Sequence, residues 1–173
     1  MHLIKNLTVQ LTKPMSASIS ATEFRIVNWI GPDGNKHEEY RLADYESHFK
    51  IIFCFQHWCP GCHSAGFPNL QKLYDTFKND QKFMFFAIQT VFEGHKVNSF
   101  DKLRENQLKY KLPIPFGQDE GTASGHELST LMQDYKTRGT PWFLFIDENN
   151  KVLFSDFHIN IDAALIFLKS RKS

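Results

Sequence analysis

Residues 53–63 read FCFQHWCPGCH, an apolar run followed by two cysteines three positions apart, Cys59 and Cys62. The apolar run predicts a buried strand, and the spacing of apolar residues after Cys59 predicts a helix. A helix N-terminus offers unpaired N–H groups and the positive end of the helix dipole, which stabilise a thiolate. Because the thiolate is the form that attacks disulfides, the stretch predicts redox chemistry.

The whole chain has the size and composition of one globular domain. It contains 173 residues, of which 42% are hydrophobic, enough for one core and too few residues for two comfortable domains. Twenty Lys and Arg against nineteen Asp and Glu leave a formal charge of +1 without a basic block. Neither nucleic acid nor a membrane surface is therefore expected as a partner. We expect a single domain over 1–173, with an N-terminal β extension over 1–50 and an inserted helical and loop block over about 94–136.

The number of cysteines bears on the compartment. Three cysteines are too few for a disulfide scaffold, and Cys54 would be a spare thiol in an oxidising compartment. Residues 1–10 lack the apolar core of a secretory signal, and no segment reaches the ~18 apolar residues of a membrane span. We therefore expect a cytoplasmic location, with an extracytoplasmic one as the alternative if Met1 replaces a removed segment.

Apolar spacing and turn residues divide the chain into alternating strands and helices. The order strand–helix–strand at its centre predicts a parallel pair with a right-handed crossover. The expected elements are an N-terminal hairpin (7–11, 24–30 and 36–42), a central strand (51–55), a helix from Cys59 kinked at Pro68, a strand (83–88), a helix (98–111), an edge or extended segment (112–116), a loop (118–126), a helix (128–135), a hairpin (142–146 and 152–154) and a final helix (161–168).

The Cys-x-x-Cys spacing assigns different roles to the two thiols. In the first turn of a helix, residues i and i+3 share a face, so both sulfurs can meet. Cys59, nearer the helix start, is expected to attack a disulfide, and Cys62, one turn inward, to resolve the mixed disulfide. Pro60 suits the first helical position, and Gly61 leaves the space above the sulfurs open.

A zinc site is the first alternative for this pair, because His57 and His63 flank it. Structural zinc needs four ligands, and without a second Cys-x-x-Cys all of them would come from the seven residues 57–63. That run is too short to wrap a tetrahedron, so no metal is expected. A second alternative, a buried and inert pair, fits poorly with the flanking Trp58, Pro60 and Gly61.

A second motif, Gly139-Thr140-Pro141-Trp142, stands just before a predicted strand. Together with Trp58-Cys59-Pro60-Gly61-Cys62 it resembles thioredoxin-fold proteins, closest to the TlpA-like reductases and related redoxin-domain (AhpC/TSA-related) proteins. In that fold the Trp-Cys-x-x-Cys motif follows the first core strand and a cis-proline faces the disulfide. Phe67-Pro68 resembles the TlpA-like helix proline one residue late, and Leu42-Ala43-Asp44-Tyr45 resembles the stretch before the core strand. The resemblance spans roughly residues 20–169.

The resemblance implies an α/β, thioredoxin-like fold: a central mixed sheet flanked by helices, with an N-terminal hairpin extension and an insertion before the cis-proline. It implies a cis Pro141 and a Thr140 backbone that pairs with a bound substrate strand, beside Trp58, Pro60 and Gly61. The implied activity is that of a thiol–disulfide oxidoreductase without a cofactor. Such an enzyme would reduce protein or small disulfides with electrons from a thiol donor.

The sequence departs from the family at its proton acceptors. Thioredoxin keeps a buried acid six residues before the first cysteine, where this chain has Phe53. Several TlpA-like proteins carry Glu shortly before the helix proline, where this chain has Ala65 and Gly66. The remaining candidates for proton transfer are His57, His63 and Glu93.

Two other functions stay open at this point. Peroxiredoxins share the fold and need Pro-x-x-x-Thr/Ser-x-x-Cys, but this chain has Ile52 and Gln56 at the proline and hydroxyl positions. The other alternative is a non-catalytic thioredoxin-fold module whose thiols only sense redox state. Its first cysteine would have an ordinary pKa of about 8.5.

Overall fold

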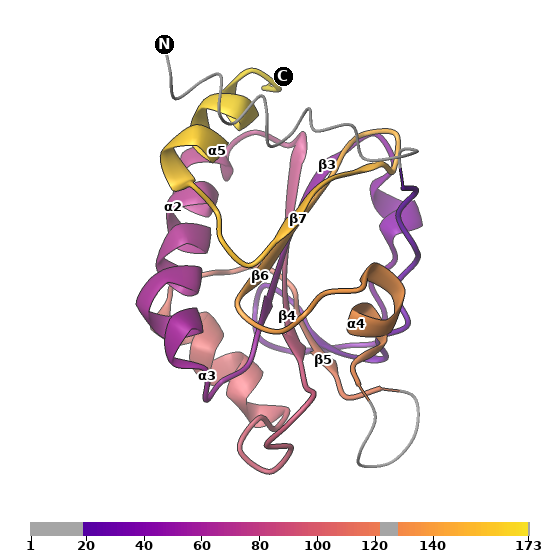
Figure 1. Ribbon diagram of the computed structural model, residues 1–173, viewed down its shortest axis with the longest axis vertical. Helices are drawn as coiled ribbons and strands as arrows, with labels where there is room; N and C mark the ends of the chain where they lie inside the picture. Colours follow the sequence, from indigo (N-terminus) through magenta and orange to yellow (C-terminus); the bar gives the residue numbers. More distant parts are fainter. Residues whose placement is uncertain (1–18, 122–127, 173) are drawn as a thin grey trace.

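The computed structural model describes residues 19–121 and 128–172. Within this part of the chain, seven strands form one mixed sheet in the order β2-β1-β5-β4-β3-β6-β7, and helices cover both of its faces (Figure 1). The strands are β1 (Asn28–Ile30), β2 (Lys36–His37), β3 (Phe49–Phe55), β4 (Phe83–Thr90), β5 (Phe116–Asp119), β6 (Trp142–Ile146) and β7 (Val152–Asp156). The helical segments are η1 (Leu42–Tyr45), η2 (Cys62–Gly66), α2 (Phe67–Phe77), α3 (Asp101–Lys109), α4 (Thr130–Tyr135) and α5 (Ile161–Lys169).

Strand β3 is the centre of the sheet. It pairs in parallel with β4 and antiparallel with β6, and all seven of its residues are buried. Phe53 and Phe55 point into the core on one face, while Ile52 and Cys54 point into the core on the other. Burial on both faces explains why this run is continuously apolar instead of alternating. The predicted central strand and the parallel β3–α2–β4 unit are confirmed.

The helices divide between the two faces of the sheet. Figure 1 shows α2, α3 and α5 on one face and α4 on the other. Helix α2 buries an apolar stripe against the sheet, as its spacing predicts. The buried residues of that stripe are Phe67, Leu70, Leu73 and Phe77. Residues of β3 belong to the core on each face of the sheet, and the C-terminal end of β3 leads into the cysteine motif.

The helix after the cysteines begins differently from the expectation. A π-helical turn, η2, precedes α2, and the Phe67 N–H donates to the Cys62 carbonyl five residues earlier. Pro68 is the second residue of α2, which follows directly on the π-helical turn. Helical backbone runs without a break from Pro60 through η2 into α2, with the wider turn placed just before Pro68, and the expected kink stays a prediction.

The place of β5 also differs from the expectation. The sequence predicts an edge or extended segment over 112–116; residues 112–115 lie outside any strand, whereas β5, which begins at Phe116, lies inside the sheet, parallel to β4 and antiparallel to β1. Pro113 and Pro115 precede the strand, so their missing N–H groups interrupt no ladder within β5. Part of the expected loop over 118–126 is strand, and residues 122–127 lie outside the described residues.

The two predicted hairpins form with different lengths. β1 and β2 pair antiparallel, but each is shorter than its predicted strand, and the expected strand over 7–11 lies outside the described residues. β6 and β7 pair antiparallel as predicted, and α4 and α5 form where apolar spacing placed them. No helix among residues 19–121 and 128–172 is long and apolar enough to cross a membrane.

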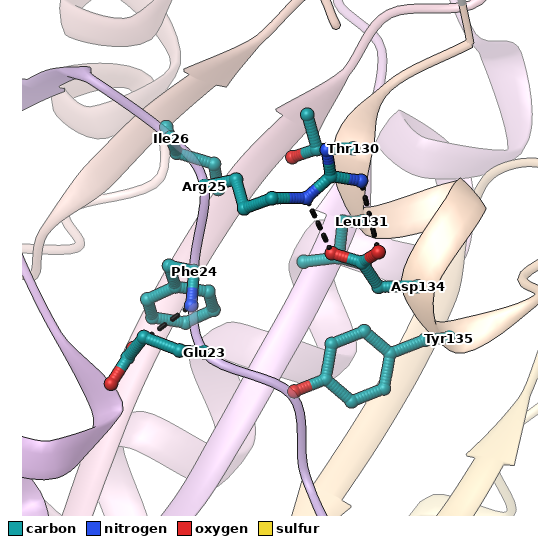
Figure 2. Close-up of a pocket in the computed structure, with 8 residues that line it drawn as sticks. All are labelled: Glu23, Phe24, Arg25, Ile26, Thr130, Leu131, Asp134 and Tyr135. Atoms are coloured by element: carbon teal, nitrogen blue, oxygen red, sulfur yellow. Dashed lines mark hydrogen bonds and ion pairs between the residues drawn. The ribbon is translucent and has the colours of Figure 1, made fainter. Parts of the chain in front are cut away.

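The segment before β1 packs against α4 across a shallow pocket (Figure 2). The Arg25 guanidinium forms an ion pair with Asp134, with Nη2 2.9 Å from Oδ1. The Tyr135 hydroxyl donates to the Thr22 carbonyl. Phe24 and Leu131, which also line the pocket, belong to the core on the opposite face of the sheet from Cys62, so the pocket does not open onto the Cys59–Cys62 pair.

Candidate active site

The two motif cysteines meet just beyond the end of β3. Cys59 is partly exposed and Cys62, the first residue of η2, is fully buried. Both are free thiols, with Cys59 Sγ and Cys62 Sγ 2.6 Å apart. Because a disulfide bond is about 2.05 Å long, a small movement can join the sulfurs.

Hydrogen bonds make Cys59 the acidic member of the pair. The Cys62 thiol donates to Cys59 Sγ, and the Cys62 N–H donates to the same sulfur over 3.2 Å. These bonds, the thiol bond above all, lower the pKa of Cys59 to about 6, although burial opposes them. Cys59 is therefore mainly a thiolate at neutral pH.

Cys62 has the opposite character. Burial raises the pKa of its thiol far above the ordinary value, and its hydrogen bond to Cys59 acts in the same direction. Cys62 consequently stays protonated and supplies the hydrogen that stabilises its neighbour. One thiolate beside one thiol is the arrangement that a nucleophile and a resolving cysteine require.

The second motif lies against the first. The Thr140–Pro141 peptide bond is cis, and the Thr140 carbonyl lies 3.6 Å from Cys59 Sγ. A Cβ atom on Gly61 would lie 3.4 Å from Pro141 Cδ, in ordinary van der Waals contact. Residues about eighty positions apart therefore meet at Cys59 Sγ, and Gly61 lies against the cis-proline.

The two motif tryptophans have different surroundings. Trp58 is 49% exposed beside Cys59, whereas Trp142 is 3% exposed and donates through Nε1 to Ser155 Oγ. Trp58 therefore leaves an apolar surface open beside Cys59, whereas Trp142 belongs to the core.

Buried amide side chains hold the chain just before Cys59. Gln89 Oε1 accepts from the His57 N–H over 2.8 Å, and Asn98 Oδ1 accepts from the Trp58 N–H over 3.1 Å. Gln89 Nε2 donates in turn to Gln118 Oε1 over 2.7 Å. The sequence did not identify these amides, because no local pattern separates a buried Gln or Asn from one in a loop.

The three candidates for proton transfer lie around the pair without touching it. His63 contacts the Tyr110 hydroxyl and the His57 carbonyl, and His57 Nδ1 lies 3.0 Å from Asn106 Nδ2. Burial lowers the pKa of His57, and Glu93 is exposed. In the part of the chain that the structure covers, no hydrogen bond joins these side chains to either sulfur. Proton transfer by any of them stays a prediction.

An aromatic ring occupies the position where the resemblance expects a buried acid. The Phe53 ring packs against Phe67 and Phe143 within the core that also contains Cys62. A Cβ atom on Gly66 would come within 2.6 Å of Phe53 Cζ, so the motif turn lies directly on this ring. The apolar surroundings contribute to the burial that keeps Cys62 protonated. Among the described residues, no group of three or more His, Cys, Asp or Glu is arranged to hold a metal ion.

The mixed sheet, the cysteine pair at the start of a helical segment and the cis-proline beside it define a thioredoxin-like protein. The chain belongs to the Redoxin family, which it matches over residues 19–163. The expected family and fold class are confirmed.

Solved structures agree with this fold. A crystal structure of a thioredoxin-like superfamily protein is 28% identical, with a TM-score of 0.76, covering 90% of this chain and 96% of that one. A thiol-disulfide isomerase from Corynebacterium glutamicum is 22% identical, with a TM-score of 0.71 and the same coverages of 90% and 96%. The thioredoxin domain of a thiol-disulfide oxidoreductase from Bacteroides vulgatus is 14% identical, with a TM-score of 0.59, covering 88% of this chain and 99% of that one. No curated protein matches the chain in sequence.

Proposed function

We propose that this protein is a thiol–disulfide oxidoreductase in which Cys59 attacks and Cys62 resolves. The observation that carries the proposal is the asymmetry of the pair: the partly exposed Cys59 has a pKa of about 6, and burial keeps Cys62 protonated. Membership of the Redoxin family and the neighbouring thiol-disulfide isomerase and oxidoreductase structures support it.

The reaction is a pair of thiol–disulfide exchanges. Cys59 thiolate attacks one sulfur of a substrate disulfide, and the other substrate sulfur leaves as a thiolate. Cys62 then gives up its proton to solvent or to that leaving thiolate, and its sulfur attacks Cys59 Sγ. The bond between Cys59 and the substrate breaks, so the substrate leaves with two thiols and the pair is left as a disulfide. An external thiol donor reduces the pair again.

Substrates would bind along the cis-proline segment. The Thr140 backbone lies beside Cys59 and outside β6, so it is free of that strand's ladder and can pair with an extended peptide. Trp58, Pro60 and Gly61 would border the same site from the cysteine side. Protein disulfides in extended segments fit this platform, and small disulfides need only Cys59.

A redox titration tests the proposal and sets its direction. The protein is equilibrated with glutathione or dithiothreitol buffers, and the Cys59–Cys62 disulfide is quantified by thiol labelling. A reversible two-electron couple is expected, and its potential on the range from about −270 to about −120 mV separates a reductase from an oxidant. The absence of such a couple would contradict the proposal.

The roles of the two cysteines are tested by trapping. Cys62→Ser should accumulate a mixed disulfide between Cys59 and a protein or glutathione disulfide, while Cys59→Ser should accumulate none. Cys54→Ala is the matched control, because Cys54 is fully buried and should leave both results unchanged. Hydroperoxide turnover that depends on Cys59 and exceeds disulfide turnover would instead favour the peroxidase alternative.

A further inference from the structure

The His63 ring links the two ends of the segment that carries both cysteines. Its Nε2 lies 2.5 Å from the carbonyl oxygen of His57, and its Nδ1 lies 2.5 Å from the Tyr110 hydroxyl. A carbonyl can only accept, so Nε2 carries the hydrogen and donates it. The bond from His63 to His57 closes a loop around Trp58-Cys59-Pro60-Gly61-Cys62.

Tyr110 holds this ring from outside the motif. Its own ring stacks on Phe67 with centroids 4.2 Å apart and planes at 6°, and its carbonyl accepts from Gln71 Nε2 over 2.8 Å. Both contacts come from α2, so the hydroxyl is fixed relative to the helix that follows the motif. The hydroxyl can donate to Nδ1 of a neutral imidazole, which leaves Nε2 as the donor.

The closed loop bears on the hydrogen bonds that stabilise the attacking thiolate. The Cys59 N–H donates to the Gln56 carbonyl over 3.1 Å, and the Cys62 N–H donates to Cys59 Sγ over 3.2 Å. The second bond exists only while Cys59 and Cys62 keep their relative orientation in the turn. The amide bonds to the His57 and Trp58 N–H groups hold the strand side of this turn, and the His63 bond adds a cross-link from its helix side, just beyond Cys62.

We propose that His63, held by Tyr110, is a positioning residue that keeps the Cys62 N–H directed at the Cys59 sulfur. The proposal rests on the function proposed above and adds two residues to that site. It differs from proton transfer by His63, because both ring nitrogens already have partners within the fold. It also differs from stabilisation of the thiolate by a charged His63, which needs no bond to His57.

Two substitutions at His63 separate these explanations. His63→Gln can place an amide N–H near the former Nε2 and donate to the His57 carbonyl, but it cannot carry a proton charge. His63→Phe keeps an aromatic ring beside Phe67 and Tyr110 and loses both hydrogen bonds. Tyr110→Phe keeps the stack on Phe67 and removes only the hydroxyl. Tyr74→Phe is the matched control. It removes a hydroxyl from a tyrosine on α2, the helix that Tyr110 stacks on, and the Tyr74 ring contacts Phe85 away from the cysteines.

The readouts are the Cys59 pKa, from the ultraviolet absorbance of the thiolate against pH, and the potential of the pair. His63→Phe should raise the Cys59 pKa by one unit or more and shift the equilibrium towards the disulfide by up to about tenfold, which is about 30 mV more reducing. Tyr110→Phe should shift both in the same direction by less. His63→Gln should stay close to the unsubstituted protein, and Tyr74→Phe should be unchanged.

Equal shifts in His63→Phe and His63→Gln would overturn the proposal, because they would assign the effect to the imidazole's proton or charge. Unchanged values in His63→Phe would overturn it as well. If His63→Phe does not fold, an unchanged Cys59 pKa in folded Tyr110→Phe would overturn the proposal instead. If the unsubstituted pair shows no reversible couple, the proposed function fails, whereas the pKa measurement still decides the role of His63.

Discussion

The two motif thiols differ in chemistry because they differ in burial. Cys59 lies at the surface end of the turn and receives two hydrogen bonds from Cys62, while Cys62 lies over the apolar core that contains Phe53. A charge is stabilised at the first position and excluded at the second. One residue type therefore gives an acidic thiol and a proton-bearing partner without an acidic side chain beneath them.

The pH dependence of alkylation follows from this difference. The rate at which iodoacetamide modifies Cys59 should rise about tenfold per pH unit below its pKa of about 6 and level off above it, because only the thiolate reacts. The measurement is the pseudo-first-order rate in reduced protein between about pH 4 and about pH 8. Cys59→Ser should leave no fast phase in this range. A midpoint near the ordinary cysteine value of about 8.5 would contradict the prediction.

The motif residues could be predicted because their signals are local or shared with a family. Cys59 and Cys62 are three positions apart in the sequence, and Pro141 belongs to a second recognisable motif. Tyr110 and Asn98 could not be found in this way. Each reaches the motif across about forty residues or more through one polar atom, and nothing in their own neighbourhoods marks that contact.

At the scale of elements, the fit of η2 on β3 depends on the absence of a side chain at Gly66. A methyl group there would lie 2.6 Å from Phe53 Cζ and 3.1 Å from Pro141 Cβ. Gly66→Ala should therefore lower the free energy of unfolding by about 1–3 kcal/mol through overpacking, as measured by urea denaturation. Gly61→Ala is the matched comparison, because its methyl group would meet Pro141 at 3.4 Å and should cost clearly less. Equal losses in the two variants would contradict the packing argument.

Strand β5 shows why the position of a strand within the sheet could not be predicted from the sequence. Pro113 and Pro115 are adverse signals for a central strand, but both lie just outside the ladder. Its polar residues Gln118 and Asp119 suggested a loop, yet both are buried and hydrogen-bonded. Element type follows from local patterns, whereas burial of a polar residue is decided by partners distant in sequence.

Asp119, the last residue of β5, links this strand to helix α4. Its carboxylate accepts from the Thr130 N–H, the Thr130 hydroxyl and the Leu131 N–H, and thereby joins β5 to the start of α4. Asp119→Ala should lower the free energy of unfolding by about 1–3 kcal/mol, because it leaves buried donors without an acceptor. Asp162→Ala at the exposed start of α5 should change it much less, as measured in the same urea titration. A loss at Asp119 no larger than at Asp162 would contradict this role.

At the scale of the whole molecule, the redox state and folding stability are linked through Cys59. Its pKa is about 6 in the folded protein and about 8.5 in an unfolded chain, so the folded reduced form binds fewer protons between these values. A lowered pKa adds stability that is fully present above the unfolded value and is lost as the pH falls through about 6. The oxidised protein has no thiolate and lacks this contribution. The stability of the reduced form relative to the oxidised form should therefore decrease from about pH 8 to about pH 5.

The measurement is urea denaturation of both redox forms at each pH, taken as a difference. Groups such as His57, whose pKa burial lowers, titrate in both forms and largely cancel in that difference. The raised pKa of Cys62 takes effect only at pH values above about 8.5, so it lies outside the measured range. Cys59→Ser, compared with the reduced protein, should lack the decrease on acidification. A difference between the redox forms that stays constant across this range would show that the thiolate does not couple to folding.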